Sequence, residues 1–119
     1  MLQNRLYTID NKESETNSVK YIILQNQESE IFKAHFPGNP ITPGACLIEI
    51  GKELCEDYFG KKLSIKTIKS VKFMNLITPI HAPQIQYNID FTKLEESIQA
   101  KIIISSHDVI CSKINMELA

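Results

Sequence analysis

Hydrophobic residues change their spacing along this chain, and the change predicts where one helix and a set of strands lie. From about Gly44 to Phe59, apolar residues recur at helical spacing, with charged residues opposite them. The predicted buried face holds Leu47, Ile50, Gly51, Leu54, Cys55 and Tyr58, and the predicted exposed face holds Lys52, Glu53 and Glu56. Gly60 follows, and glycine is common where a helix ends, so we expect the helix to end near it.

After this helix the apolar residues alternate with polar ones, which is typical of strands with one covered face. The alternation is regular at Ile85, Tyr87, Ile89 and Phe91. We expect strands near 70–74, 84–91, 98–105 and 109–118, with turns at 93–96 and at His107-Asp108. In the last strand Ile110, Ile114, Met116 and Leu118 share one parity.

Before the helix the pattern predicts shorter elements. Leu6–Ile9 and Val19–Leu24 are expected strands, and the polar segment Asn11–Ser18 between them is an expected turn. Ile31–Phe36 is a third expected strand. Short connections favour antiparallel pairing, so we predict an α+β domain over residues 1–119, with about six antiparallel strands wrapped around one long central helix.

Composition excludes some classes of protein. The net charge is −1 with acids and bases interspersed, which argues against a nucleic-acid partner held by phosphate neutralisation. We expect no membrane segment and no signal peptide. The three cysteines have no Cys-x-x-Cys spacing, so we expect neither a disulfide framework nor a metal site. A cytoplasmic location is therefore expected.

The segment before the helix is unusual because prolines stand at 37, 40 and 43 and glycines at 38 and 44. Each proline fixes its own φ angle and pushes the preceding residue toward extended backbone, so the segment is predicted to be stiff. Glycine allows a ligand to approach the backbone closely. The segment follows His35 and leads to Glu49, fourteen residues further on.

The sequence HFPGNPITPGACLIE, residues 35–49, resembles the active-site motif of the hot-dog-fold 3-hydroxyacyl-(acyl-carrier-protein) dehydratases. SVKFMNLITPI and SHDVICSKINMEL resemble the segment after the helix and the closing hairpin of that family. The resemblance therefore covers most of the chain, and a motif with so many fixed positions is specific.

The resemblance implies a role for individual residues. His35 and Glu49 match the catalytic histidine and carboxylate, and Gly44 matches the glycine whose N–H binds the thioester carbonyl. Phe36 and Ala45 are implied substrate contacts. The family implies an acyl carrier protein as partner, no cofactor, and a homodimer whose sites combine side chains of both protomers, with a trimer of dimers as a further assembly.

The chemistry of the implied reaction suits these groups. A neutral histidine can accept the proton next to the thioester carbonyl, so His35 is the expected base. A carboxyl group in an apolar tunnel has a raised pKa, so Glu49 is the expected acid, or the group that holds the leaving water. An N–H at a helix start, here that of Gly44, is suited to bind the thioester oxygen as negative charge develops on it.

Other interpretations of these residues stay open. Helical periodicity alone places Glu49 on a solvated face, and His35 could be a strand-end residue that bonds a backbone carbonyl. Cys46 stands near a helix start, where a thiol can be acidified, although buried packing is the simpler interpretation. The lysines at 61, 62, 66, 69 and 72 are either a protected strand edge or a surface for an acidic carrier protein.

One departure from the family pattern is Glu53, where many members carry glutamine. The charged helix face around it motivates a second hypothesis, a non-catalytic hot-dog subunit or an acyl-carrier-binding partner. A hot-dog acyl thioesterase is a third. A dehydratase that also isomerises the double bond is disfavoured, because the acid of that family is typically aspartate.

Overall fold

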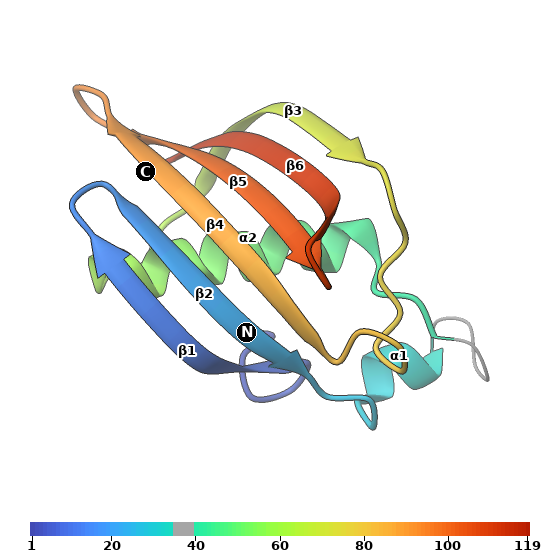
Figure 1. Cartoon of the computed structure of the whole chain (residues 1–119). Helices are drawn as coiled ribbons and strands as arrows, with labels where there is room; N and C mark the ends of the chain where they lie inside the picture. The colour runs from blue at the N-terminus through green and yellow to red at the C-terminus, as the bar shows by residue number, and fades with distance from the viewer. Residues whose placement is uncertain (35–39) are drawn as a thin grey trace.

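The computed structural model describes residues 1–34 and 40–119 of the chain, and its main feature is a curved antiparallel sheet with one helix across a face (Figure 1). The elements are β1 (Tyr7–Glu15), β2 (Ser18–Gln25), α1 (Glu30–Ala34), α2 (Gly44–Phe59), β3 (Ile65–Phe73), β4 (Gln84–Lys93), β5 (Ile98–Ser106) and β6 (Val109–Leu118).

The six strands form one sheet in the order β1-β2-β4-β5-β6-β3, and every neighbouring pair is antiparallel. The sheet curls around α2, so the helix fills its concave side (Figure 1). This confirms the predicted α+β architecture with six strands around a central helix. β1 and β3 form the two edges of the sheet.

The core lies between the sheet and α2. The alternating residues of β4 predicted to face inward are buried, as are Leu47, Ile50, Leu54 and Cys55 of the helix. Gly51 lets the sheet approach closely, because a Cβ at this position would lie 2.8 Å from Cδ1 of Ile102. The predicted buried helix face is therefore confirmed by the packing, with Tyr58 partly buried at its end.

Three tyrosines of the sheet fix α2 in place through their hydroxyl groups. Tyr87 of β4 donates to the backbone oxygen of Leu47 at 2.9 Å. Tyr7 of β1 and Tyr21 of β2 donate to carboxylates of the helix, as described below. Each ring is almost completely buried, so these residues supply both apolar area and one satisfied polar group.

The ends of α2 agree with the prediction. Pro43 precedes the helix with extended backbone, and Gly60 ends it with φ 67° and ψ 32°. This left-handed conformation favours glycine, and it lets the N–H of Gly60 donate to the backbone oxygen of Glu56 at 2.8 Å. Within the described residues, no helix combines the length and apolar character needed to cross a membrane.

Two predictions before the helix are wrong. Of the predicted strand Ile31–Phe36, residues 31–34 belong instead to the short helix α1, Glu30–Ala34, which buries Phe32, and the last two residues lie outside the described residues. Short apolar runs fit a strand or a buried helical turn equally well. The segment predicted as a turn, Asn11–Ser18, mostly continues β1, and only Thr16 and Asn17 connect the strands.

The predicted parity of the last strand is also wrong at its start. Ile110 is 42% exposed, whereas Ile114, Met116 and Leu118 are buried. A register shift in the β5–β6 pair pairs Ser105 with Ile110 but Ile104 with Ser112, so β6 holds one extra residue. A bulge of this kind moves the preceding side chains to the other face of the sheet.

Candidate active site

The N-terminal end of α2 suits an oxygen atom that carries negative charge. The first N–H groups of a helix have no acceptor within the helix, and no described side chain caps this one. Among residues 1–34 and 40–119, no hydrogen bond engages the N–H of Gly44. The positive end of the helix dipole adds to the field at this point. An oxygen atom that gains charge during a reaction would therefore be stabilised here.

Gly44 is also required by packing. A Cβ at this position would lie 2.6 Å from Cζ of Phe73, which is closer than two non-bonded carbon atoms approach one another. The Phe73 side chain, from the end of β3, therefore lies directly against the start of the helix. Any larger residue at 44 would displace the ring or occupy the space in front of the N–H.

The backbone before the helix is fixed by buried hydrogen bonds. The N–H of Thr42 donates to the backbone oxygen of Ile77 at 2.8 Å, and the Thr42 hydroxyl donates to Oε1 of Gln25 at 2.5 Å. The amide nitrogen of Gln25 in turn donates to the backbone oxygen of Ala82 at 2.9 Å. This network ties the start of α2 to β2 and to the loop after β3, which orients the Gly44 N–H.

A mostly apolar cavity of about 320 Å³ lies beside this helix end. Its lining residues come from the segment before α2, the first turn of the helix, the end of β3 with the loop that follows, and β6. They are Ile41, Thr42, Pro43, Gly44, Leu47, Phe73, Asn75, Leu76, Ile77 and Ser112. The size and apolar character are those of a small-molecule site.

Glu49 lies on α2 but on another side of the helix. Its carboxylate is 3.2 Å from Nζ of Lys52 and its side chain is 38% exposed. It lies five positions after Gly44, which corresponds to a rotation of about 140° around a helix of 3.6 residues per turn. The structure therefore does not bring the Glu49 carboxylate and the Gly44 cavity together within one chain.

The other predicted site residues divide into two groups. His35 and Phe36 lie outside the residues that the structure describes. Ala45 is exposed in the first turn of α2 and is not among the residues that line the cavity.

Glu53 is the residue whose environment the sequence pattern failed to predict. Helical periodicity places it on the exposed face, but only 3% of it is exposed. Its carboxylate accepts hydrogen bonds from the N–H groups of Leu2 at 2.8 Å and Gln3 at 2.9 Å and from the hydroxyl of Tyr7 at 3.1 Å. Burial and the Glu53 charge together raise the pKa of Tyr7, which keeps this hydroxyl a donor.

Asp57 forms a second carboxylate contact further along α2. It accepts a hydrogen bond from the Tyr21 hydroxyl at 2.6 Å and pairs with Nζ of Lys12 at 3.0 Å. Burial opposes ionisation of Asp57, but the two donors outweigh it and lower the pKa of the carboxyl group. Glu53 and Asp57 thus fasten one side of α2 to the start of the chain and to β1 and β2.

Cys55 and Cys111 are buried, and Cys46 is partly buried against the core. All three are free thiols. Burial, helped by the charge of Glu49, raises the pKa of Cys46, so the helix start does not acidify this thiol. Burial raises the pKa of Cys55 to about 12. In the described part of the chain, no three His, Cys, Asp or Glu side chains cluster as metal ligands do.

The remaining histidines lie in turns, as predicted. His107 occupies the β5–β6 turn with φ 51°, and its Nε2 is 3.2 Å from the backbone oxygen of His81. Both residues are exposed. Neither residue lines the cavity at the start of α2.

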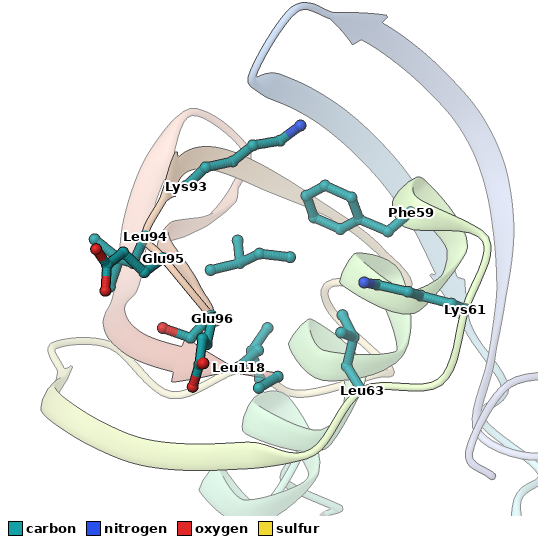
Figure 2. Close-up of a pocket in the computed structure, with 11 residues that line it drawn as sticks. Phe59, Lys61, Leu63, Lys93, Leu94, Glu95, Glu96 and Leu118 are labelled. Carbon is teal, nitrogen blue, oxygen red and sulfur yellow. The ribbon is translucent and has the colours of Figure 1, made fainter.

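A larger cavity of about 430 Å³ lies at the opposite end of α2 (Figure 2). Figure 2 shows Lys93 from the end of β4 and the β4–β5 turn on one side of this cavity, with Phe59 and Lys61, at and just after the end of α2, on the other. It contains none of the predicted site residues. Its lining includes the charged side chains of Lys61, Lys93, Glu95 and Glu96.

Comparison with known proteins identifies the class of fold. The ApeI:P dehydratase heterocomplex from Xenorhabdus doucetiae superposes with a TM-score of 0.74, covering 93% of this chain and 96% of that chain at 17% identity. A protein from Erwinia carotovora subsp. atroseptica gives a TM-score of 0.69 over 94% of this chain and 92% of that chain, at 15% identity. The sheet wrapped around α2 is thus a hot-dog fold.

The family follows from the sequence comparisons. The model of the ApeI-like family, described as ApeI dehydratase, matches residues 11–113. This chain therefore belongs to the ApeI-like dehydratase family.

Among curated relatives, the 3-hydroxyacyl-(acyl-carrier-protein) dehydratase FabZ of Fusobacterium nucleatum subsp. nucleatum is 33% identical over 66% of this chain and 57% of its own length. FabZ of Wolbachia pipientis wMel is 34% identical over 60% of this chain and 55% of its own length. The match thus spans little more than half the length of these two relatives.

Proposed function

We infer that this protein dehydrates carrier-bound (3R)-3-hydroxyacyl thioesters to trans-2-enoyl thioesters, in fatty-acid synthesis or a related polyene or polyketide pathway. The observation that supports this best is the N–H of Gly44, which no described residue engages and which belongs to the lining of an apolar cavity, in a chain of a dehydratase family. An acyl chain fits an apolar cavity, and the thioester oxygen suits a donor at a helix start.

In this proposal the His35 imidazole removes a proton from the carbon next to the thioester carbonyl. The Gly44 N–H holds the thioester oxygen while enolate character develops there. Glu49 donates a proton to the departing 3-hydroxyl group, which leaves as water. The double bond forms between the two carbons, and the product remains attached to the carrier.

We place the acid of each site on a second copy of the chain. The rotation of about 140° between Gly44 and Glu49 supports this, because one chain cannot direct both groups into one cavity. β3 is an edge strand of the sheet and leaves backbone groups available for pairing with another strand. A two-fold symmetric homodimer would supply the missing carboxylate to each cavity.

Mixing two inactive variants tests the reaction and the assembly together. We expect His35→Ala and Glu49→Gln each to abolish turnover of a 3-hydroxyacyl-carrier substrate. When equal amounts of the two variants exchange subunits at random, about half of the dimers are mixed. Each mixed dimer has one of its two sites intact, so about one quarter of the wild-type activity should return. No recovery in mixed dimers verified by mass would exclude a shared site. No wild-type turnover at any chain length would exclude the reaction by this chain alone.

The same assay separates two other functions. Release of free carrier thiol instead of enoyl product would identify a thioesterase. A second candidate is a subunit that acts only with another hot-dog protein, which is favoured because the structural neighbour from Xenorhabdus doucetiae is a dehydratase heterocomplex. That role predicts turnover only after a partner chain is added, and a stable complex of unlike chains by native mass spectrometry.

The acyl carrier protein is proposed to meet the lysines on β3. Lys66, Lys69 and Lys72 are exposed on this strand. Their positive charges would attract a partner with an acidic surface. Replacing all three by glutamine should raise KM for the carrier-bound substrate and flatten its salt dependence. KM for a small thioester without a carrier should stay unchanged. Equal effects on both substrates would contradict docking at these lysines.

A further inference from the structure

Ser112 on β6 carries a buried hydroxyl group with no partner among the described residues. No part of the residue is exposed, and within residues 1–34 and 40–119 its Oγ is the one buried side-chain oxygen or nitrogen that lacks a hydrogen bond. Buried polar groups are almost always bonded, because an unpaired one is costly. An apolar residue such as alanine would avoid that cost. We therefore expect the hydroxyl to have a partner outside the described part of the chain.

The sheet register places this hydroxyl beside the cavity at the start of α2. Ser112 pairs with Phe73 on β3 and with Ile104 on β5. Residues paired across strands share a face of the sheet, and the Phe73 ring lies against Gly44 of the helix. Ser112 therefore faces α2, and it is one of the residues that line the cavity.

The other polar side chains of the cavity are already engaged. The Thr42 hydroxyl donates to Gln25, and the Asn75 side-chain amide donates to the backbone oxygen of Ile110 at 2.9 Å. The remaining lining side chains are apolar. Among the described residues, Ser112 is thus the buried side chain of this cavity whose hydroxyl has no partner.

We propose that Ser112 hydrogen-bonds an oxygen substituent on the acyl chain of the substrate, and so selects acyl chains that carry a hydroxyl or carbonyl group over plain hydrocarbon chains. This inference rests on the proposed function, which puts the thioester at Gly44 and the acyl chain in the adjoining cavity. A hydroxyl group both donates and accepts, so it serves either kind of oxygen.

The dimensions of the cavity favour an acyl chain as the occupant. At roughly 30 Å³ for each water-sized group, 320 Å³ holds about ten such groups. Phe73 and Leu76 are exposed at its margin, whereas Ser112 is fully buried. A slender chain that enters past these two side chains would contact the hydroxyl after a small shift of the side chains that cover it.

Binding of unreactive thioesters tests the inference without relying on turnover. The probes are saturated acyl thioesters of N-acetylcysteamine, up to about ten chain atoms long, as the cavity volume allows. One series is plain, and the other carries a single hydroxyl at successive carbons from carbon 4 onward, because a 3-hydroxyacyl thioester would itself react in the proposed mechanism. Titration calorimetry would compare the wild type with Ser112→Ala and Ser112→Cys. Thr42→Val is the matched control, because it removes a hydroxyl of the same cavity that already has a partner.

We expect one hydroxyl position to give the greatest preference over the plain chain. That preference should fall by about tenfold in Ser112→Ala, as the loss of one buried hydrogen bond implies, and persist in Thr42→Val. Equal preferences in the wild type and Ser112→Ala would overturn the inference. The inference would also be overturned if Ser112→Ala weakened self-association in sedimentation but left the ligand preference unchanged. The hydroxyl would then serve contact between copies of the chain.

Turnover of matched 3-hydroxyacyl thioesters separates this inference from the proposed function. Hydroxyl-dependent binding without dehydration would overturn the proposed reaction and leave the role of Ser112 intact. Dehydration without any preference between plain and oxygenated chains would overturn the role of Ser112 and leave the proposed reaction intact.

Discussion

The ring of Phe73 lies against the backbone of Gly44, so that a Cβ on Gly44 would be 2.6 Å from Cζ of the ring. Phe73 comes from the end of an edge strand and Gly44 from the first position of α2. The contact joins the sheet edge to the helix start at the cavity. It also makes glycine the residue that leaves the N–H accessible.

Gly44→Ala is expected to impair catalysis more than folding. The Phe73 side chain is 53% exposed, so the ring can move and relieve the overlap. The new methyl group and the displaced ring would then crowd the N–H that we assign to the thioester oxygen. We expect kcat/KM to fall by about a hundredfold or more, the effect of losing one oxyanion donor. The melting temperature should change by only a few degrees.

The double variant Gly44→Ala with Phe73→Leu identifies the cause. Partial recovery of kcat/KM would show that the displaced ring blocks the site. Continued loss would assign the block to the methyl group itself. Full activity of Gly44→Ala alone would remove Gly44 from the proposed mechanism.

Glu53→Gln is expected to destabilise the protein strongly. Its carboxylate accepts three hydrogen bonds from the first residues of the chain, and an amide offers one oxygen and places an NH₂ group against a donor. We expect the free energy of unfolding to fall by about 2–4 kcal/mol in urea titrations. Tyr7→Phe removes one of the three donors and should cost about 1 kcal/mol.

Glu49→Gln is the matched control, one helical turn earlier. Its side chain is partly exposed and pairs with Lys52 at 3.2 Å, so the free energy of unfolding should change by no more than about 0.5 kcal/mol. Equal stability losses in Glu49→Gln and Glu53→Gln would contradict the structural difference between them.

The helix and most strands could be predicted from sequence because their signals are local. The bounds of α2 follow from Pro43 and Gly60, and the alternation in β4 is regular. Ile31–Phe36 was ambiguous because one helical turn and one short strand bury a similar apolar run. The bulge that exposes Ile110 depends on the register between β5 and β6. The local sequence pattern does not determine this register.

The environment of Glu53 could not be predicted, because the residues that bury it lie about fifty positions earlier in the chain. The helical wheel correctly separates it from the face that meets the sheet, but the first residues of the chain cover this side of α2 as well. The role of Gly44 was proposed from the resemblance of its motif, and the structure adds the packing of Phe73 against it. The lack of a partner for the Ser112 hydroxyl among the described residues depends on tertiary packing, which the sequence pattern does not specify.

The contact between Tyr21 and Asp57 predicts a pH-dependent share of stability. The pKa of Asp57 is lowered in the folded protein, so this share is complete above the unfolded pKa of about 3.9 and is lost as the pH falls through the folded value. Asp57→Asn should cost about 1 kcal/mol at pH 7, a modest value because 36% of the side chain is exposed. The cost should shrink in urea titrations at progressively lower pH.

Tyr21→Phe provides the check on that prediction. It removes the hydroxyl that donates at 2.6 Å, so its cost should shrink over the same acidic range. The double variant should cost less than the sum of the single ones, because both remove the same bond. A cost of Asp57→Asn that stays constant with pH would show that the lowered pKa does not contribute to stability.

Ser112→Ala and Thr42→Val are expected to change stability in opposite directions, although both remove a hydroxyl from the same cavity lining. The Thr42 hydroxyl is bonded to Oε1 of Gln25, so its removal leaves a buried oxygen without its donor and should cost about 1–2 kcal/mol. The Ser112 hydroxyl has no partner among the described residues, so its removal should stabilise the ligand-free protein by about 1 kcal/mol. Urea titration of the free protein measures both changes in stability.

Adding a tightly bound oxygenated thioester should reduce or reverse the stability advantage of Ser112→Ala, because ligand binding then stabilises the wild type more. A destabilised Ser112→Ala without ligand would mean that the hydroxyl already has a partner and is not held for the substrate.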